Sequence, residues 1–181
     1  MNLDLWLFQA INGLAGKSNF WDTFFLYFSQ WSPVIFVILL MFAYIYYRDT
    51  TIIIKAMLII GLCFLFKGLF GLFFFKDRPY ITLKTTNFIG APDSSSSMPS
   101  GHTMFAFGSF FPTQDYKNWF TILMLFLALL SAFSRIYLGY HYPSDILAGI
   151  IVSFVFYFAV EYLFERPKIK EILKKIRNKY K

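Results

Sequence analysis

Long apolar runs separated by short polar segments make up most of this 181-residue chain. Several runs are long enough to cross a bilayer, whose hydrocarbon core requires about 20 mostly apolar residues per helix. They cover residues 20–47, 51–75, 119–138 and 146–164. A shorter apolar run, residues 102–111, begins directly after a Pro-Ser-Gly turn. This pattern predicts an all-α fold built as a multispan transmembrane helical bundle.

Two segments near the N-terminus have a pattern that differs from a simple membrane-spanning helix. Ser32-Pro33 interrupts the first long run, and a proline removes one helical hydrogen bond and favours a kink. The pattern leaves open whether residues 20–31 and 34–47 form one bent helix or two. Residues 1–16 lack the basic start of a signal peptide and carry apolar residues at helical spacing. We expect a short interfacial helix there, with a membrane-spanning segment as the alternative, and roughly five to six membrane helices in total.

Composition supports the membrane interpretation. The chain is 57% hydrophobic and only 15% charged, whereas soluble domains average about 45–50% apolar and about 25% charged residues. An aromatic content of 23% also excludes a disordered chain, because disordered chains are poor in aromatic residues. The single cysteine, Cys63, excludes an internal disulfide and a multi-cysteine metal site. We expect Cys63 to be an inert core residue.

Most of the formal net charge of +7 lies at the C-terminus. Residues 165–181 hold eight of the 17 Lys and Arg residues and two of the 10 acidic ones. Positive charge accumulates on the cytoplasmic side of membrane proteins. The sequence therefore predicts a membrane-embedded domain over residues 1–164 and a basic cytoplasmic tail over residues 165–181. The tail would attract anionic membrane lipids; no aromatic surface accompanies it, so nucleic acid is not an expected partner.

The predicted cytoplasmic tail also indicates on which side of the membrane each loop lies. Counting helices back from it places the turns at residues 48–50 and 112–118 on the cytoplasmic side. The loop at residues 76–100 and the turn at residues 139–145 then lie on the external face. Within that loop, the serine run 94–97 is interpreted as flexible, with a lid or a headgroup contact as the alternative.

Polar clusters on this predicted external face interrupt the apolar pattern. The clusters are Lys76-Asp77-Arg78-Pro79, then Pro99-Ser100-Gly101-His102, and finally Ser134 and Arg135 with His141 and Asp145. The chain has two histidines, and each lies in one of these clusters. The predicted topology brings all of the clusters to one side of the membrane, so their side chains are candidates for a single site.

Some residues of these polar clusters have groups that can bind an anion. Arg78 and Arg135 offer planar, permanently charged forks for bidentate phosphate recognition. Ser100 and Gly101 precede the short helix, whose N-terminus presents free N–H groups and the positive end of the helix dipole. Gly101 also lets the backbone approach the anion closely. These four residues are therefore the candidate phosphate ligands.

The histidines supply candidate reactive groups. His141 and Asp145 are four residues apart, so the carboxylate is positioned to hold one imidazole tautomer and stabilise its positive charge. His102 then remains as a general acid. Together with the phosphate ligands, these residues indicate phosphoryl transfer through a histidine nucleophile.

The clusters resemble the type 2 phosphatidic acid phosphatase superfamily, whose pattern is Arg-Pro, then Pro-Ser-Gly-His, then Ser-Arg-x5-His-x3-Asp. The resemblance covers roughly residues 67–160. It implies a helical bundle and a metal-independent mechanism without a cofactor. It also implies that His141 attacks phosphorus to form a phosphohistidine, that Asp145 orients it, and that His102 protonates the leaving group. The resemblance further implies that Arg78, Ser100, Gly101 and Arg135 bind the phosphate oxygens.

The first motif departs from the family pattern. The family places a lysine seven residues before the motif arginine, where this chain has Gly71. Lys67 lies 11 residues before Arg78, roughly 16 Å along a continuous helix, which a lysine side chain does not easily close. We therefore expect Lys76 to bind the phosphate instead, or the site to use one cation fewer. Lys67 is either functional or paired with a buried polar group.

The expected function is a phosphatase of the bacterial inner membrane that removes the terminal phosphate of a lipid at the external, periplasmic face. Resemblance suggests undecaprenyl pyrophosphate, lipid A 1-phosphate, phosphatidylglycerophosphate or phosphatidic acid as the substrate, and the motifs do not choose among them. A vanadate-dependent haloperoxidase of the same superfamily is soluble, so the apolar spans count against it. A non-catalytic lipid-binding or transport protein would not need His102, His141 and Asp145 together. The sequence gives no oligomeric state.

Overall fold

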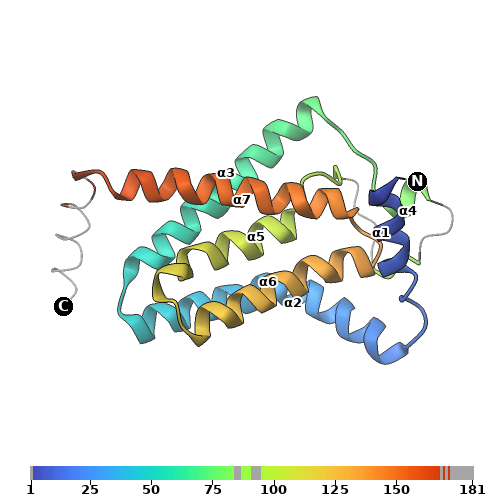
Figure 1. The fold of residues 1–181 in the computed structure, drawn as a ribbon, viewed down its shortest axis with the longest axis horizontal. Helices are drawn as coiled ribbons and strands as arrows, with labels where there is room; N and C mark the ends of the chain where they lie inside the picture. The colour runs from blue at the N-terminus through green and yellow to red at the C-terminus, as the bar shows by residue number, and fades with distance from the viewer. Residues whose placement is uncertain (1, 84–86, 91–94, 168, 170, 172–181) are drawn as a thin grey trace.

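The long helices form an elongated bundle in the computed structural model, which describes residues 2–83, 87–90, 95–167, 169 and 171 (Figure 1). No strand occurs within these ranges, and the predicted all-α class is confirmed. The elements are α1 (Leu3–Asn12), α2 (Asn19–Tyr47), α3 (Thr50–Phe73), α4 (Pro79–Thr82), α5 (Gly101–Phe110), the 3₁₀ helix η1 (Phe111–Tyr116), α6 (Trp119–Tyr137) and α7 (Pro143–Phe164).

Four helices, α2, α3, α6 and α7, are long and apolar enough to cross a membrane within the described part of the chain. Each coincides with one of the predicted runs, so the chain is a multi-pass membrane protein. Helix α7 begins at Pro143, three residues before its apolar run, because proline fits the first turn of a helix. The side chain of Asp145 accepts the backbone N–H of Tyr142 at 2.9 Å and caps this turn.

Helix α2 is continuous through Pro33, which settles the alternative that the sequence leaves open. Proline has no N–H, so the carbonyl of Ser29, four residues earlier, loses its helical donor. The Ser32 hydroxyl donates to that carbonyl at 3.1 Å. A neighbouring side chain thus satisfies the carbonyl that the proline leaves without a helical donor, as membrane helices require.

Helix α5 occupies the centre of the bundle and packs against α2, α3, α6 and α7 (Figure 1). Glycines make this close packing possible. A Cβ atom at Gly149 of α7 would lie 3.1 Å from both the Ser100 carbonyl oxygen and the Thr103 Cβ. At Gly108 of α5 it would lie 2.9 Å from Ile60 Cγ1. Helix α5 is therefore held closely between α3 and α7, inside the membrane-spanning bundle.

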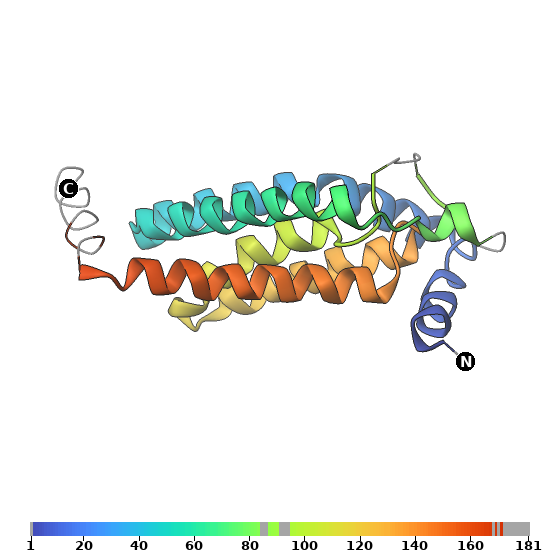
Figure 2. The same ribbon diagram turned by 90° about the horizontal axis from the view of Figure 1, so that it is seen from above.

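Helix α1 crosses one end of the bundle, nearly perpendicular to the long helices (Figure 2). Its ten residues are too few to span a bilayer, consistent with the expected interfacial helix. Asp4 accepts hydrogen bonds from the Ser144 N–H at 2.7 Å and the Ser144 hydroxyl at 2.6 Å, so α1 also caps α7. The C-terminal end of α7 lies at the opposite end of the bundle, and most of the predicted tail lies outside the described residues.

Candidate active site

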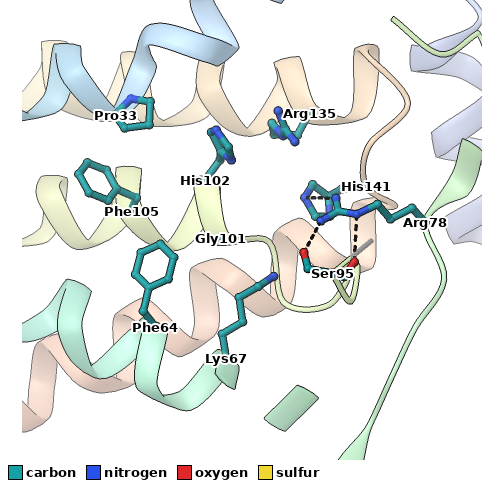
Figure 3. Close-up of a pocket in the computed structure, with 10 residues that line it drawn as sticks. All are labelled: Pro33, Phe64, Lys67, Arg78, Ser95, Gly101, His102, Phe105, Arg135 and His141. Carbon is teal, nitrogen blue, oxygen red and sulfur yellow. Dashed lines mark hydrogen bonds between the residues drawn. The ribbon is translucent and has the colours of Figure 1, made fainter. Parts of the chain in front are cut away.

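The polar clusters meet in a cavity of about 310 Å³ at the N-terminal end of α5, as the sequence predicts (Figure 3). The basic side chains lie toward one end of this cavity, and apolar side chains from α2, α3 and α5 form the other end. The lining residues are Pro33, Phe64, Lys67, Arg78, Ser95, Gly101, His102, Phe105, Arg135 and His141.

His141 lies in the turn between α6 and α7 and is only 2% exposed. Its Nε2 is 3.2 Å from Arg78 Nη1 (Figure 3). A guanidinium group only donates hydrogen bonds, so Nε2 is the acceptor and the ring hydrogen is on Nδ1. Burial lowers the pKa of His141 well below 6.5, and the charges of Arg135 and Arg78 lower it further. The imidazole is therefore neutral at pH 7, with a lone pair on Nε2.

Ser97 lies between His141 and Asp145. His141 Nδ1 is 3.6 Å from Asp145 Oδ2, too far for a hydrogen bond, but 3.3 Å from Ser97 Oγ. The Ser97 hydroxyl donates to Asp145 Oδ2 at 2.5 Å, so it accepts the hydrogen of Nδ1. The predicted direct pair is thus a chain of three groups. Sequence reasoning missed Ser97 because a serine within a serine run gives no sign of which hydroxyl is buried.

Lys76 is placed differently from the expectation that it would be a phosphate ligand. Its ammonium group donates to Asp145 Oδ1 at 2.6 Å and to Ser144 Oγ at 2.9 Å, and Lys76 is not among the residues that line the cavity. The reason is the chain path: α3 ends at Phe73, and the following non-helical segment carries Lys76 to the start of α7. Lys76 therefore balances the charge of the buried carboxylate.

Lys67 lines the cavity instead. Its ammonium group donates to the carbonyl oxygens of Pro99 at 2.7 Å and Ser96 at 3.3 Å, which holds it beside the N-terminus of α5 (Figure 3). The predicted separation of Lys67 and Arg78 requires one continuous helix between them. Since α3 ends at Phe73, the chain returns Arg78 to the same cavity, and the prediction that Lys67 lies too far from Arg78 was wrong.

Both arginines are fixed by protein contacts. Arg78 donates from Nε to the Ser95 carbonyl at 3.1 Å and from Nη2 to Ser95 Oγ at 2.9 Å. Arg135 donates from Nη1 to Ser29 Oγ at 2.8 Å, and its Cζ lies 3.8 Å from the centre of the Tyr140 ring. Both side chains are buried, so their forks are oriented before any anion arrives. Such preorganisation reduces the entropic cost of binding.

These contacts also revise the interpretation of the serine run. Ser95, Ser96 and Ser97 each hydrogen-bond a residue of the site or of its supporting loop, and Ser96 and Ser97 are buried. These contacts favour the alternative, a contact beside the site, over a flexible loop for these three residues, while Ser94 lies outside the described residues.

Ser100 and Gly101 occupy different positions. Ser100 is fully buried, and its N–H donates to the Asp145 carbonyl at 3.1 Å, so this predicted phosphate ligand joins α5 to α7 behind the cavity wall. Gly101 lines the cavity, and a Cβ there would contact Phe64 at 3.6 Å and Lys67 at 3.9 Å. His102 lines the cavity from the first turn of α5. Among the described residues no group of three or more His, Cys, Asp or Glu could hold a metal ion.

Similarity to known proteins identifies the family of this chain. The family model for the PAP2 superfamily matches residues 50–168. The chain belongs to the PAP2 superfamily. Undecaprenyl-diphosphatase BcrC of Bacillus subtilis is 24% identical to this PAP2 protein over 153 residues, which cover 82% of this chain and 78% of the relative. The resemblance derived from the sequence motifs is thereby confirmed.

Two solved structures share the fold of this PAP2 protein. Aquifex aeolicus LpxE superposes with a TM-score of 0.77 at 25% identity, covering 90% of this chain and 96% of the other. A PAP2-type phosphatidylglycerolphosphate phosphatase from Bacillus subtilis superposes with a TM-score of 0.68 at 21% identity, covering 91% and 88%. The protein is therefore a membrane phosphatase of the PAP2 superfamily.

Proposed function

We propose that this protein hydrolyses the terminal phosphate of a lipid phosphate or diphosphate through a phosphohistidine on His141. The observation that carries the proposal is a neutral, buried imidazole whose Nε2 faces Arg78, in a cavity that also contains Lys67, Arg135 and His102. Similarity to an undecaprenyl-diphosphatase supports a lipid diphosphate as one substrate class.

The proposed reaction has two steps. His141 Nε2 attacks phosphorus, the bond between phosphorus and the leaving oxygen breaks, and His102 donates a proton to that oxygen. The Ser97 hydroxyl accepts the Nδ1 hydrogen and donates to Asp145, and these two groups stabilise the positive charge that develops on the ring. Water then attacks the phosphorus of the phosphohistidine and His102 accepts its proton. The bond between phosphorus and His141 Nε2 breaks, and inorganic phosphate leaves.

Cationic and backbone donors surround the reacting phosphate in this proposal. Arg78 and Arg135 provide forks, Lys67 provides a point charge, and the first turn of α5 at Gly101 provides N–H groups. The positive groups stabilise the charge on the phosphate oxygens in the transition state, which is a large contribution in phosphoryl transfer.

The apolar end of the cavity fits the lipid chain. Pro33 of α2, Phe64 of α3 and Phe105 of α5 line it, so the chain would remain among helices that face the bilayer (Figure 3). The turn between α6 and α7, which contains His141, lies at the end of the bundle opposite to the C-terminal end of α7 (Figure 2). With a cytoplasmic tail following α7, this arrangement supports a site that opens toward the external face of the inner membrane.

The test is phosphate release by purified protein in detergent, assayed with the lipid phosphates named above and with excess EDTA. We expect release from at least one lipid at a rate that EDTA leaves unchanged. Activity that EDTA removes and a divalent cation restores would overturn the metal-independent mechanism. No release from any of the lipids would favour a binding or transport role.

Lys67→Met should raise KM about 10- to 100-fold, since a hydrogen bond to a charged group contributes about 1.5–3 kcal/mol. Lys76→Met is the matched control, because Lys76 contacts Asp145 and not the cavity. Lys76→Met should mainly lower kcat. Steady-state kinetics in detergent separate the two effects, and a larger KM increase in Lys76→Met would reverse the assignment.

Ser97→Ala should lower kcat about 10- to 100-fold with little change in KM, because Nδ1 loses its acceptor and Asp145 loses a donor. Ser96→Ala is the control. Ser96 is also buried, but its hydroxyl accepts from the Lys76 N–H and donates to the Met98 carbonyl. If Ser96→Ala lowers kcat as much as Ser97→Ala, then Ser97 acts only through loop structure.

A further inference from the structure

A second cavity, of about 370 Å³, lies beside the candidate active site between α2 and α6. His102 and Arg135 line both cavities, so these two side chains form a shared wall. The remaining lining residues come from the first half of α2 and the end of α6 with its turn. They are Leu26, Ser29, Gln30, Leu138 and Tyr140.

Gln30 is the unexplained residue of this cavity. It lies 11 residues into the apolar α2, roughly 16 Å from the start of that helix. Its side chain is exposed and forms no hydrogen bond with another described residue. An amide without a hydrogen-bond partner within an apolar, membrane-spanning helix is costly, so its presence beside His102 and Arg135 indicates a polar ligand.

The second cavity lies next to the leaving-group acid. In the proposed function, on which this inference rests, His102 protonates the oxygen that joins the terminal phosphate to the rest of the lipid. The active cavity becomes apolar away from the basic groups, at Pro33, Phe64 and Phe105, and offers no donor to a second phosphate there. The neighbouring cavity offers the Gln30 amide and the Arg135 guanidinium, which Ser29 orients.

We propose that this second cavity binds the chain-proximal phosphate of a lipid diphosphate, with Gln30 and Arg135 donating to its oxygens. For a diphosphate the leaving group is a lipid monophosphate. These donors would stabilise the negative charge that develops on its oxygens as the bond to the terminal phosphorus breaks. A monophosphate lipid has no group to place there. Gln30 is therefore a specificity residue that favours diphosphates over monophosphates carrying the same chain.

The experiment compares farnesyl diphosphate with farnesyl phosphate, which differ only in the second phosphate, as substrates of full-length protein in detergent. Initial rates give kcat/KM for each substrate. Gln30→Leu should reduce kcat/KM for the diphosphate about 10-fold and leave the monophosphate value unchanged. Gln30→Glu should reduce the diphosphate value further, because the added carboxylate repels the phosphate. Thr23→Val, another exposed polar-to-apolar change on α2 outside this cavity, should change neither value.

The outcomes separate this inference from the proposed function. If Gln30→Leu lowers both values equally, or neither, the second-phosphate site is wrong while phosphatase activity stands. If the wild-type protein releases phosphate from neither farnesyl compound nor any bacterial lipid phosphate, the proposed function itself fails. Gln30 is exposed, so its replacement leaves the packed core intact, and thermal unfolding in detergent checks this for each variant.

Discussion

Replacing His141 with alanine should reduce phosphate release by about 10⁴-fold or more, because the group that forms the covalent intermediate is removed. The loss should be in kcat, since Arg78, Arg135 and Lys67 still line the cavity and bind the phosphate. The measurement is initial-rate phosphate release at saturating lipid by detergent-purified variants.

A folding control accompanies this variant because His141 is buried and hydrogen-bonded on both ring nitrogens. His141→Gln retains a polar side chain of similar length, yet it should be as inactive as His141→Ala. Both proteins should elute as the wild type does in detergent size-exclusion chromatography. A well-folded His141→Gln protein that retains a tenth of wild-type activity would contradict the nucleophile assignment.

Replacing His102 with asparagine should have an effect that depends on the leaving group. An alcohol leaves as a strongly basic alkoxide unless it is protonated, so hydrolysis of a lipid monophosphate should slow about 10²- to 10⁴-fold. An aryl phosphate with an acidic phenol needs no proton to leave, so formation of its phosphoenzyme should slow far less. Rapid-mixing measurement of the first turnover, by phenol absorbance, isolates this step.

Arg78→Lys is the comparison variant for that experiment. Arg78 binds the phosphate in the proposed reaction, so its replacement should slow both substrates by a similar factor. If His102→Asn also slows the first turnover of both substrates equally, His102 binds phosphate and does not act as the general acid.

The spans and the clustering of the motifs were predictable because each follows from a local rule. A helix in a bilayer must be long and apolar, so the hydropathy pattern predicts α2, α3, α6 and α7. With these spans in place, counting membrane crossings brings Arg78, His102, Arg135 and His141 to one side, and the cavity contains all four.

The roles of Lys67, Lys76 and Ser97 were not predictable, because they depend on the path of the loop between α3 and α5. Helix α3 ends two residues before its apolar run does, and this early end separates Lys76 from the cavity and returns Arg78 to it. Ser97 differs from its serine neighbours only in burial and contacts, which composition does not encode. Continuity of α2 through Pro33 likewise depends on the side-chain bond from Ser32.

The central claim is that His141 carries the phosphoryl group, and trapping that intermediate tests it most directly. The wild-type protein is mixed with lipid diphosphate, quenched at alkaline pH to preserve phosphohistidine, digested, and analysed by peptide mass spectrometry. We predict a phosphoryl group on His141 in the wild type and none in His141→Ala. A phosphoryl group on any other residue, or full turnover without a phosphoenzyme, would contradict the account.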